Sequence, residues 1–125
     1  MRFPRGRRIT SRRIFLRIRE EGQSYRGHFL VLGLLHAPEK VQTVRVGYIT
    51  TRRLGNAVTR NRVRRRLRGI LQRTGDRLKP GNFLVLIARG PAANADSAAL
   101  EKEWKWLAHR AKLFEGDAET LPENK

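Results

Sequence analysis

Residues 52–73 constrain the fold of this chain more than any other part of its sequence. The segment reads RRLGNAVTRNRVRRRLRGILQR and contains nine arginines and no acidic residue. Four apolar residues in it fall at i, i+4, i+7 and i+8, the spacing that gathers side chains on one helix face: Val63, Leu67, Ile70 and Leu71. The sequence therefore predicts a helix over about residues 59–73, with one apolar face toward a core.

The arginines of this segment have no partners within it. They lie outside the apolar arc at Arg62, Arg64, Arg65, Arg66, Arg68 and Arg73. A solvated charged face is usually stabilised by opposite charges at i,i+4, and no Asp or Glu is present here to supply them. Like charges at that spacing cost a few tenths of a kcal/mol each, and Gly69 costs about 1 kcal/mol relative to alanine. We therefore expect an external anion to bind this face.

The composition of the whole chain indicates which anion. Its 28 basic and 11 acidic residues give a net charge of +17, and 22 of the 28 are arginine. A guanidinium pairs bidentately with phosphate and stacks on bases, so nucleic acid is the leading candidate. An anionic membrane surface is the alternative. Helices that bind membranes usually carry Trp or Phe on the apolar face, whereas this one has Val, Leu and Ile.

Several classes of protein are excluded or disfavoured. The chain has no cysteine, which excludes disulfides, thiolate zinc sites and thiol nucleophiles. No apolar run approaches the roughly 20 residues of a membrane span. The arginines near the N-terminus are followed by no apolar signal core. We expect a cytoplasmic protein that does not bind membranes.

The remaining sequence predicts the order α-β-β-α-β-α, with a possible extra short strand. A first helix capped by Thr10 or Ser11 ends before Gly22, and strands are expected at 28–35, 43–51 and 82–88. Gly55 and Asn56 both tolerate positive φ, so a break between elements is expected there. A last helix is expected after Asp96 or Ser97, with five residues on one face: Leu100, Trp104, Leu107, Ala111 and Phe114. Trp106 is out of phase with that face and is expected to be a partly exposed packing residue, or alternatively to contact RNA.

This order suggests an α+β fold in which helices pack on one sheet. Residues 1–8 are expected to form a flexible basic arm, residues 9–114 a single RNA-binding domain, and residues 115–125 a disordered acidic tail.

The stretch from Gly55 to Arg68, GNAVTRNRVRRRLR, resembles the Arg-Asn-Arg signature of the protein subunit of bacterial ribonuclease P. The flanks agree: Phe15 with Gly22, then Arg45-Val46-Gly47, and then residues 88–92, ARGPA. The resemblance spans about residues 8–114. It implies a two-layer α/β sandwich with a mostly antiparallel central sheet and a left-handed βαβ crossover, the fold of the second domain of ribosomal protein S5. Generic handedness rules predict the opposite hand.

The resemblance also implies a function. The family's protein binds a catalytic RNA that removes the 5′ leader of precursor tRNA with bound Mg²⁺, and the RNA performs the chemistry. The partners implied are therefore that RNA and precursor tRNA, with no obligate protein partner. The Mg²⁺ is bound mainly by the RNA subunit and the substrate, and no organic cofactor is implied. The residues expected to face the catalytic RNA are Arg52, Arg53, Arg60, Asn61, Arg62, Arg64, Arg65 and Arg68.

A second surface implied by the resemblance is a cleft between the first helix and the sheet, where the single-stranded leader lies. Phe15, Arg19 and Val31 match positions of this cleft. Arg19 replaces an aromatic residue common in the family, and Gly33 replaces another, which makes the cleft more electrostatic. Aromatic stacking above a basic groove suits single strands, although Phe15 is about equally well explained as a core residue.

The sequence offers no catalytic constellation of its own. His28, His36 and His109 are scattered, and the acidic residues form no convincing two-metal site. This agrees with a non-catalytic subunit of an RNA enzyme. The alternatives are an architectural RNA-binding protein, such as a ribosomal protein of similar fold, and a membrane-active basic protein.

Overall fold

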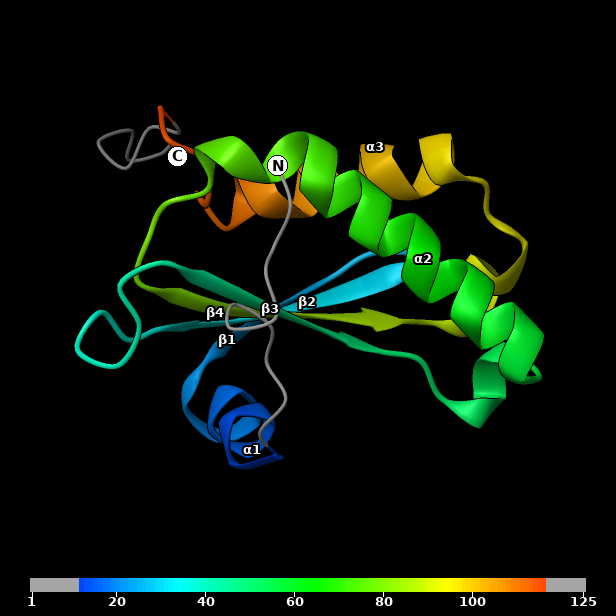
Figure 1. Ribbon diagram of the computed structural model, residues 1–125, viewed down its shortest axis with the longest axis horizontal. Coiled ribbons are helices and arrows are strands. Elements are labelled where there is room, and N and C mark those ends of the chain that lie inside the picture. Colours follow the sequence, from blue (N-terminus) through cyan, green and yellow to red (C-terminus); the bar gives the residue numbers. More distant parts are fainter. Residues whose placement is uncertain (1–11, 117–125) are drawn as a thin grey trace.

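Alternating apolar residues build a four-stranded sheet with helices on both of its faces (Figure 1). The computed structural model describes residues 12–116. Its helices are α1 (Arg12–Glu21), α2 (Ala57–Thr74) and α3 (Ser97–Arg110). Its strands are β1 (Gln23–Arg26), β2 (Leu30–His36), β3 (Val44–Ile49) and β4 (Asn82–Ala88). Short 3₁₀ segments are η2 (Arg52–Leu54), η3 (Gly75–Arg77) and η4 (Gly90–Asn94).

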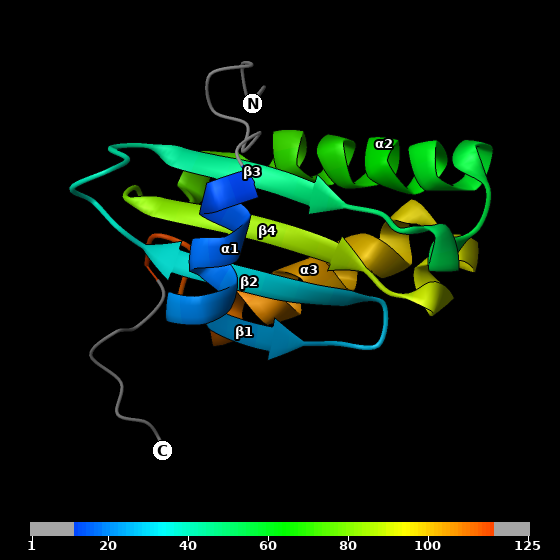
Figure 2. The ribbon, with the colours of Figure 1, turned by 90° about the horizontal axis from the view of Figure 1, so that it is seen from below.

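The strand order in the sheet is β1-β2-β4-β3. The β1–β2 and β2–β4 pairs are antiparallel, and the β3–β4 pair is parallel. In Figure 2, β3 and β4 run in the same direction and α2 connects them behind the sheet, which makes the crossover left-handed. The expected mostly antiparallel α+β sheet with this unusual crossover is confirmed, and β1 is the extra short strand.

The two faces of the sheet carry separate apolar clusters. Leu32 of β2 and Leu86 of β4 belong to the larger cluster, which is covered by α2 and α3. Val85 and Phe83 of β4 point the other way and pack with Ile18 of α1. This period-2 alternation explains why both strands are apolar along their whole length, as expected for strands covered on both faces. The sheet and the α2–α3 layer form the sandwich, and α1 crosses the opposite face (Figure 1).

A side-chain cap fixes the start of α2. The Asn56 side chain accepts a hydrogen bond from the Thr59 backbone N–H at 2.9 Å, which satisfies a donor that the first helical turn leaves free. Gly55, just before the cap, has a φ of 142°, which glycine tolerates. Asn56 has a φ of −73° and is the N-cap of the helix. The cap also starts the helix at Ala57, two residues before the expected position.

The last helix is shorter than its apolar pattern suggested. Asp96 caps it, accepting from the Ala99 N–H at 2.8 Å, and Trp104 is fully buried. The helix ends at Arg110. Ala111 and Phe114 therefore lie beyond α3, and Phe114 instead forms an isolated β-bridge with Leu78. The prediction that both belong to this helix is wrong.

Glu103 of α3 holds the turn between β1 and β2. Its carboxylate accepts backbone N–H groups from His28, Phe29 and Leu30 at 2.8, 2.7 and 2.7 Å. Gly27 lies so close that an added Cβ would be 2.4 Å from Glu103 Cδ. The close approach allows one carboxylate to satisfy three donors that the turn leaves unpaired.

Three predictions fall largely outside the described residues: the basic arm over residues 1–8, the helix cap at Thr10 or Ser11, and most of the acidic tail over residues 115–125. Glu115 is described, and its backbone N–H donates to Arg77 O at 2.6 Å. Among residues 12–116, no helix has the length and apolar character needed to cross a membrane.

Candidate nucleic-acid interface

The side of α2 that faces β3 carries three of the arginines expected at the interface. Arg64 donates to the Asn61 side chain at 3.0 Å and to the hydroxyl of Thr50, the residue after β3. The Arg68 guanidinium carbon lies 6.0 Å from the centroid of the Tyr48 ring. Arg60 is one turn before Arg64 and is half-buried. These contacts hold the guanidinium groups along the edge strand of the sheet.

The opposite side of α2 faces η4 and α3, and its arginines bind the protein itself. Arg62 donates to Ala93 O at 3.2 Å, and Arg66 donates to Ala95 O at 2.6 Å. Arg73 forms an ion pair with Glu101 of α3 at 2.6 Å. Arg62, which was expected to face RNA, directs one of its Nη groups toward a backbone carbonyl on the side of the helix away from Arg64, and its contact with RNA stays a prediction.

The outward side of α2 is open to solvent. Asn61 and Arg65 are exposed there, and Val58 is 71% exposed in the first turn. Arg52 and Arg53 are exposed in η2, just before the helix. We call these residues, together with the three arginines beside β3, the α2 surface: Arg52, Arg53, Val58, Arg60, Asn61, Arg64, Arg65 and Arg68.

The positive charge of the α2 surface is not compensated by the fold. Among residues 12–116, Arg73 is the only α2 arginine in an ion pair with a carboxylate. The Nε atoms of Arg60 and Arg68 are buried and have no hydrogen-bond partner in the same part of the chain. Burial of charged, incompletely bonded groups costs free energy, so an anion on this surface would be stabilising.

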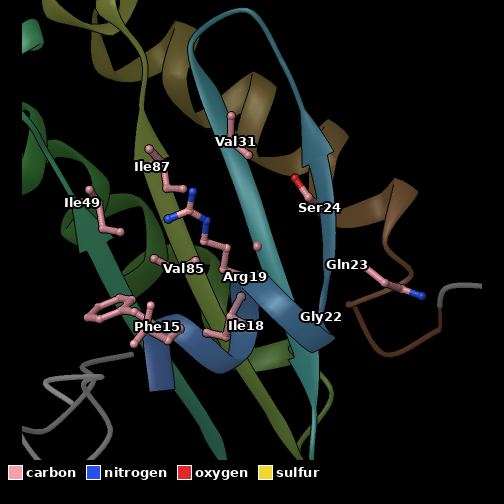
Figure 3. A pocket seen from close by; sticks show the side chains of 12 residues that line it. Phe15, Ile18, Arg19, Gly22, Gln23, Ser24, Val31, Ile49, Val85 and Ile87 are labelled. Carbon is pink, nitrogen blue, oxygen red and sulfur yellow. The ribbon is translucent and has the colours of Figure 1, made fainter. Parts of the chain in front are cut away.

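A groove lies on the other face of the sheet, between α1 and the strands (Figure 3). Its volume is about 490 Å³. Phe15, Arg19 and Val31, the three residues predicted for a cleft, all line it. Figure 3 shows the Arg19 side chain extending from α1 over β4 toward Ile87. Phe15 is half-buried and also packs on the small cluster beneath α1, so it is both a core residue and part of the groove wall.

The groove floor is formed by Gly33, Ile49, Val85 and Ile87, with Gln23 and Ser24 at the β1 side. Of these residues, only Gly33 was placed in the cleft from the sequence. The signal was present in the strand alternation. Val31 pairs with Ile87, and Gly33 pairs with Val85. Because alternate residues of a strand point to the same face, these four residues lie together on the groove floor. The pairing partners themselves were not available from the sequence.

The two surfaces meet at the end of β3. Tyr48 and Thr50 contact the arginines of α2, while Ile49 between them lines the groove. Successive residues of one strand point to opposite faces, so a single edge strand supports both surfaces. A polyanion bound at this edge can therefore contact the α2 surface and the groove together.

The described residues supply charge and shape and show no reactive centre. Residues 12–116 contain no group of three or more His, Cys, Asp or Glu side chains that could hold a metal ion. The three histidines lie in different surroundings. His36 forms a side-chain hydrogen bond with Asn82 at 3.0 Å, His28 lies in the β1–β2 turn, and His109 packs against Phe114.

Comparison with known proteins agrees with this geometry. The family model described as Ribonuclease P matches residues 3–112. The ribonuclease P protein component of Dehalococcoides mccartyi is 37% identical over 107 residues, covering 86% of each chain. That of Roseiflexus castenholzii is 32% identical over 120 residues, covering 95% of this chain and 97% of the relative.

Solved structures give the same result. The RNase P protein of Staphylococcus aureus superposes with a TM-score of 0.80 at 25% identity, covering 87% of this chain and 98% of that one. The RNase P protein of Thermotoga maritima superposes with a TM-score of 0.71 at 26% identity, covering 80% of this chain and 94% of the other.

Proposed function

Because the chain belongs to the ribonuclease P protein family, we propose that it binds the catalytic RNA of ribonuclease P through the α2 surface and the 5′ leader of precursor tRNA in the groove. In this role it is a non-catalytic subunit of an endoribonuclease that releases the mature 5′ end of tRNA. The prediction of a cytoplasmic protein stays a prediction.

The uncompensated arginines of α2 are the observation that carries this proposal. The fold holds Arg64 and Arg68 against β3 and leaves Arg65 exposed on the adjoining outward side, so three guanidinium groups are presented on neighbouring sides of the helix. Preorganised guanidinium groups lose less side-chain entropy when they pair with phosphates. An RNA backbone is the polyanion that fits a row of such groups.

The groove supports the second half of the proposal. Its floor is apolar, one wall carries an aromatic ring at Phe15, and one cation, Arg19, extends along it. Single-stranded RNA is bound by stacking on aromatic rings combined with positive charge near the backbone. The floor offers few hydrogen-bonding groups for base edges, so we expect leader binding with weak sequence preference.

We propose that the Mg²⁺ required for cleavage is bound by the RNA subunit and the substrate. The described residues do not fit a metal site, as noted above, so no step of the reaction is assigned to a protein-bound ion. The contribution of the chain is to bind both RNAs at adjacent surfaces and to reduce their mutual repulsion, which positions the leader junction for the RNA active site.

Binding of the catalytic RNA by variants of α2 tests this proposal. Arg65→Ala with Arg68→Ala should weaken binding of the catalytic RNA. Each phosphate contact contributes roughly 0.7–0.9 to the slope of log K against log salt, so the loss of two contacts should reduce the magnitude of that slope by about 1 to 2. Arg13→Ala with Arg77→Ala removes the same charge from exposed positions on α1 and η3 and is the matched control. Equal affinity of the folded α2 variant and the control would contradict the assignment of the α2 surface.

A further inference from the structure

The outer side of α3 carries an aromatic and basic stripe that the functions above do not use. The residues at i, i+4, i+7 and i+8 on this side are Lys102, Trp106, His109 and Arg110, and all four are exposed. The buried residues of the helix, Leu100, Trp104, Leu107 and Ala108, follow the same spacing two positions earlier. The helix therefore has a core face and a second, separate face with an organised pattern.

Trp106 is the central residue of this stripe. Its side chain is 51% exposed, whereas Trp104 is fully buried and donates its indole N–H to Thr74 Oγ1 at 2.9 Å. The guanidinium carbon of Arg110 lies 5.2 Å from the centroid of the Trp106 ring. Among the described residues, the Trp106 indole N–H makes no hydrogen bond. A large ring that is held by a cation and left half in water is available for stacking.

The acidic residues of α3 do not neutralise this stripe. Glu101 is bound to Arg73 and Lys105 on the side toward α2. Both oxygens of Glu103 accept backbone N–H groups of the β1–β2 turn. Lys102 and Arg110 have no carboxylate partner among residues 12–116. The stripe is therefore cationic around an exposed indole, a combination suited to an unpaired nucleotide and its phosphates.

We propose that this stripe, the α3 stripe of Lys102, Trp106, His109 and Arg110, binds an unpaired segment of the catalytic RNA. Figure 1 shows α2 and α3 side by side in one layer, with α1 on the other face of the sheet. The groove lies on that other face, beside α1. An RNA bound to α2 can therefore extend over α3, whereas the leader lies on the opposite face. A second copy of the chain is a poor occupant, because each copy carries a net charge of +17.

The inference rests on the proposed function for the identity of the RNA, and Trp106 fluorescence tests it directly. The full chain has two tryptophans, so the Trp106→Phe variant reports Trp104 alone and supplies the baseline. Titration with a bacterial ribonuclease P RNA should change the emission of the unaltered protein and leave that of Trp106→Phe nearly constant. Precursor tRNA alone and phosphatidylglycerol vesicles are titrated separately as the alternative ligands.

Affinity measurements complete the test. Trp106→Ala should weaken binding of the catalytic RNA about fivefold or more, the effect of losing one stacked base. Arg110→Ala should weaken it in the same direction, and Arg13→Ala, which removes one exposed arginine from α1, serves as the charge-matched control. Circular dichroism and thermal unfolding verify that the variants are folded.

Each outcome is informative. If the Arg65 and Arg68 variants lose affinity while Trp106→Ala binds like Arg13→Ala, the α3 stripe is not an RNA site and the proposed function survives. If neither set of variants loses affinity, the proposed function fails as well. An emission change with vesicles or with precursor tRNA alone, and none with the catalytic RNA, would overturn the assignment of the stripe to the catalytic RNA.

Discussion

Gly33 of β2 lies directly beneath Ile18 of α1. A Cβ added at Gly33 would be 3.0 Å from Ile18 Cγ2 and 2.7 Å from Val85 Cγ1, closer than side chains normally approach. The missing side chain lets α1 sit close to the sheet and sets the depth of the groove floor. The resemblance to the family implies that an aromatic residue is frequent at this position. The groove of this chain therefore differs in shape at Gly33 from a groove that carries such a ring.

Gly33→Ala should therefore destabilise the protein. The added methyl group forces α1 away from the sheet or moves Val85, at a cost of about 1–3 kcal/mol, as is typical for overpacked sites. Urea unfolding followed by circular dichroism measures the change. A comparison with Gly90→Ala is a suitable control, because no atom lies within 4 Å of a Cβ added there. Equal stability of the two variants would show that α1 has no close contact with Gly33.

The arginines on the two sides of α2 should respond differently to substitution. Arg62→Ala with Arg66→Ala removes donors from the carbonyls of Ala93 and Ala95, and should lower the free energy of unfolding by about 1–3 kcal/mol. Arg65→Ala should change it by less than about 0.5 kcal/mol, because this side chain is exposed and makes no such bond. Thermal and urea unfolding of both variants measures the difference. A stable Arg62, Arg66 double variant would argue that these arginines are free to bind RNA.

Phe15→Ala should reduce the affinity for precursor tRNA more than the affinity for mature tRNA. The ring lines the groove proposed for the leader, which mature tRNA lacks. Loss of one stacking contact weakens binding by about 1–3 kcal/mol. Binding of the two tRNAs to the assembled holoenzyme is the measurement, and Phe15→Leu tests whether apolar packing alone is sufficient. The same loss for both tRNAs would assign Phe15 a purely structural role.

The Arg73–Glu101 ion pair should give the protein an acid-sensitive contribution to stability. Hydrogen bonds from Arg73 and then from Lys105 lower the pKa of the Glu101 carboxyl below its ordinary value of 4.5. A lowered pKa in the folded state stabilises at pH values above the ordinary pKa, and this contribution is lost as the pH falls through the folded-state value. Glu101→Gln should therefore cost about 0.5–1 kcal/mol at pH 7.

The difference between the unaltered protein and Glu101→Gln should shrink toward zero as the pH falls below about 4. Urea unfolding at pH 7 and at acid pH measures it. A difference that is the same at both pH values would show that the carboxylate charge is not its source.

Local patterns in the sequence predicted the elements whose signals lie within a few residues. The apolar spacing of Val63 and Leu67 predicted the buried face of α2, and the run from Asn82 to Ala88 predicted β4 with its observed bounds. The cap of α3 at Asp96 was also predicted. Asn56 was not recognised as a cap, because an Asn after Gly suits both a cap and a positive-φ turn, and only the hydrogen bond to Thr59 distinguishes the two.

Contacts between distant segments were the part that the sequence could not supply. Arg62 and Arg66 differ in no local way from Arg65, yet they bind carbonyls 31 and 29 residues away, those of Ala93 in η4 and of Ala95 just after it. The position of η4 depends on the packing of α3 and the sheet. The groove floor depends on strand register in the same way, so Val31 was predicted and its partner Ile87 was not.

Cleavage of precursor tRNA at low Mg²⁺ tests the central claim most directly. A bacterial ribonuclease P RNA is assayed with and without the protein, and the protein is assayed alone. We expect the protein to restore cleavage at the mature 5′ end and to be inert without the RNA. The variant with Arg65→Ala and Arg68→Ala should restore much less cleavage. Binding of the RNA with no stimulation of cleavage for any precursor would contradict this expectation and would favour an architectural role in RNA binding.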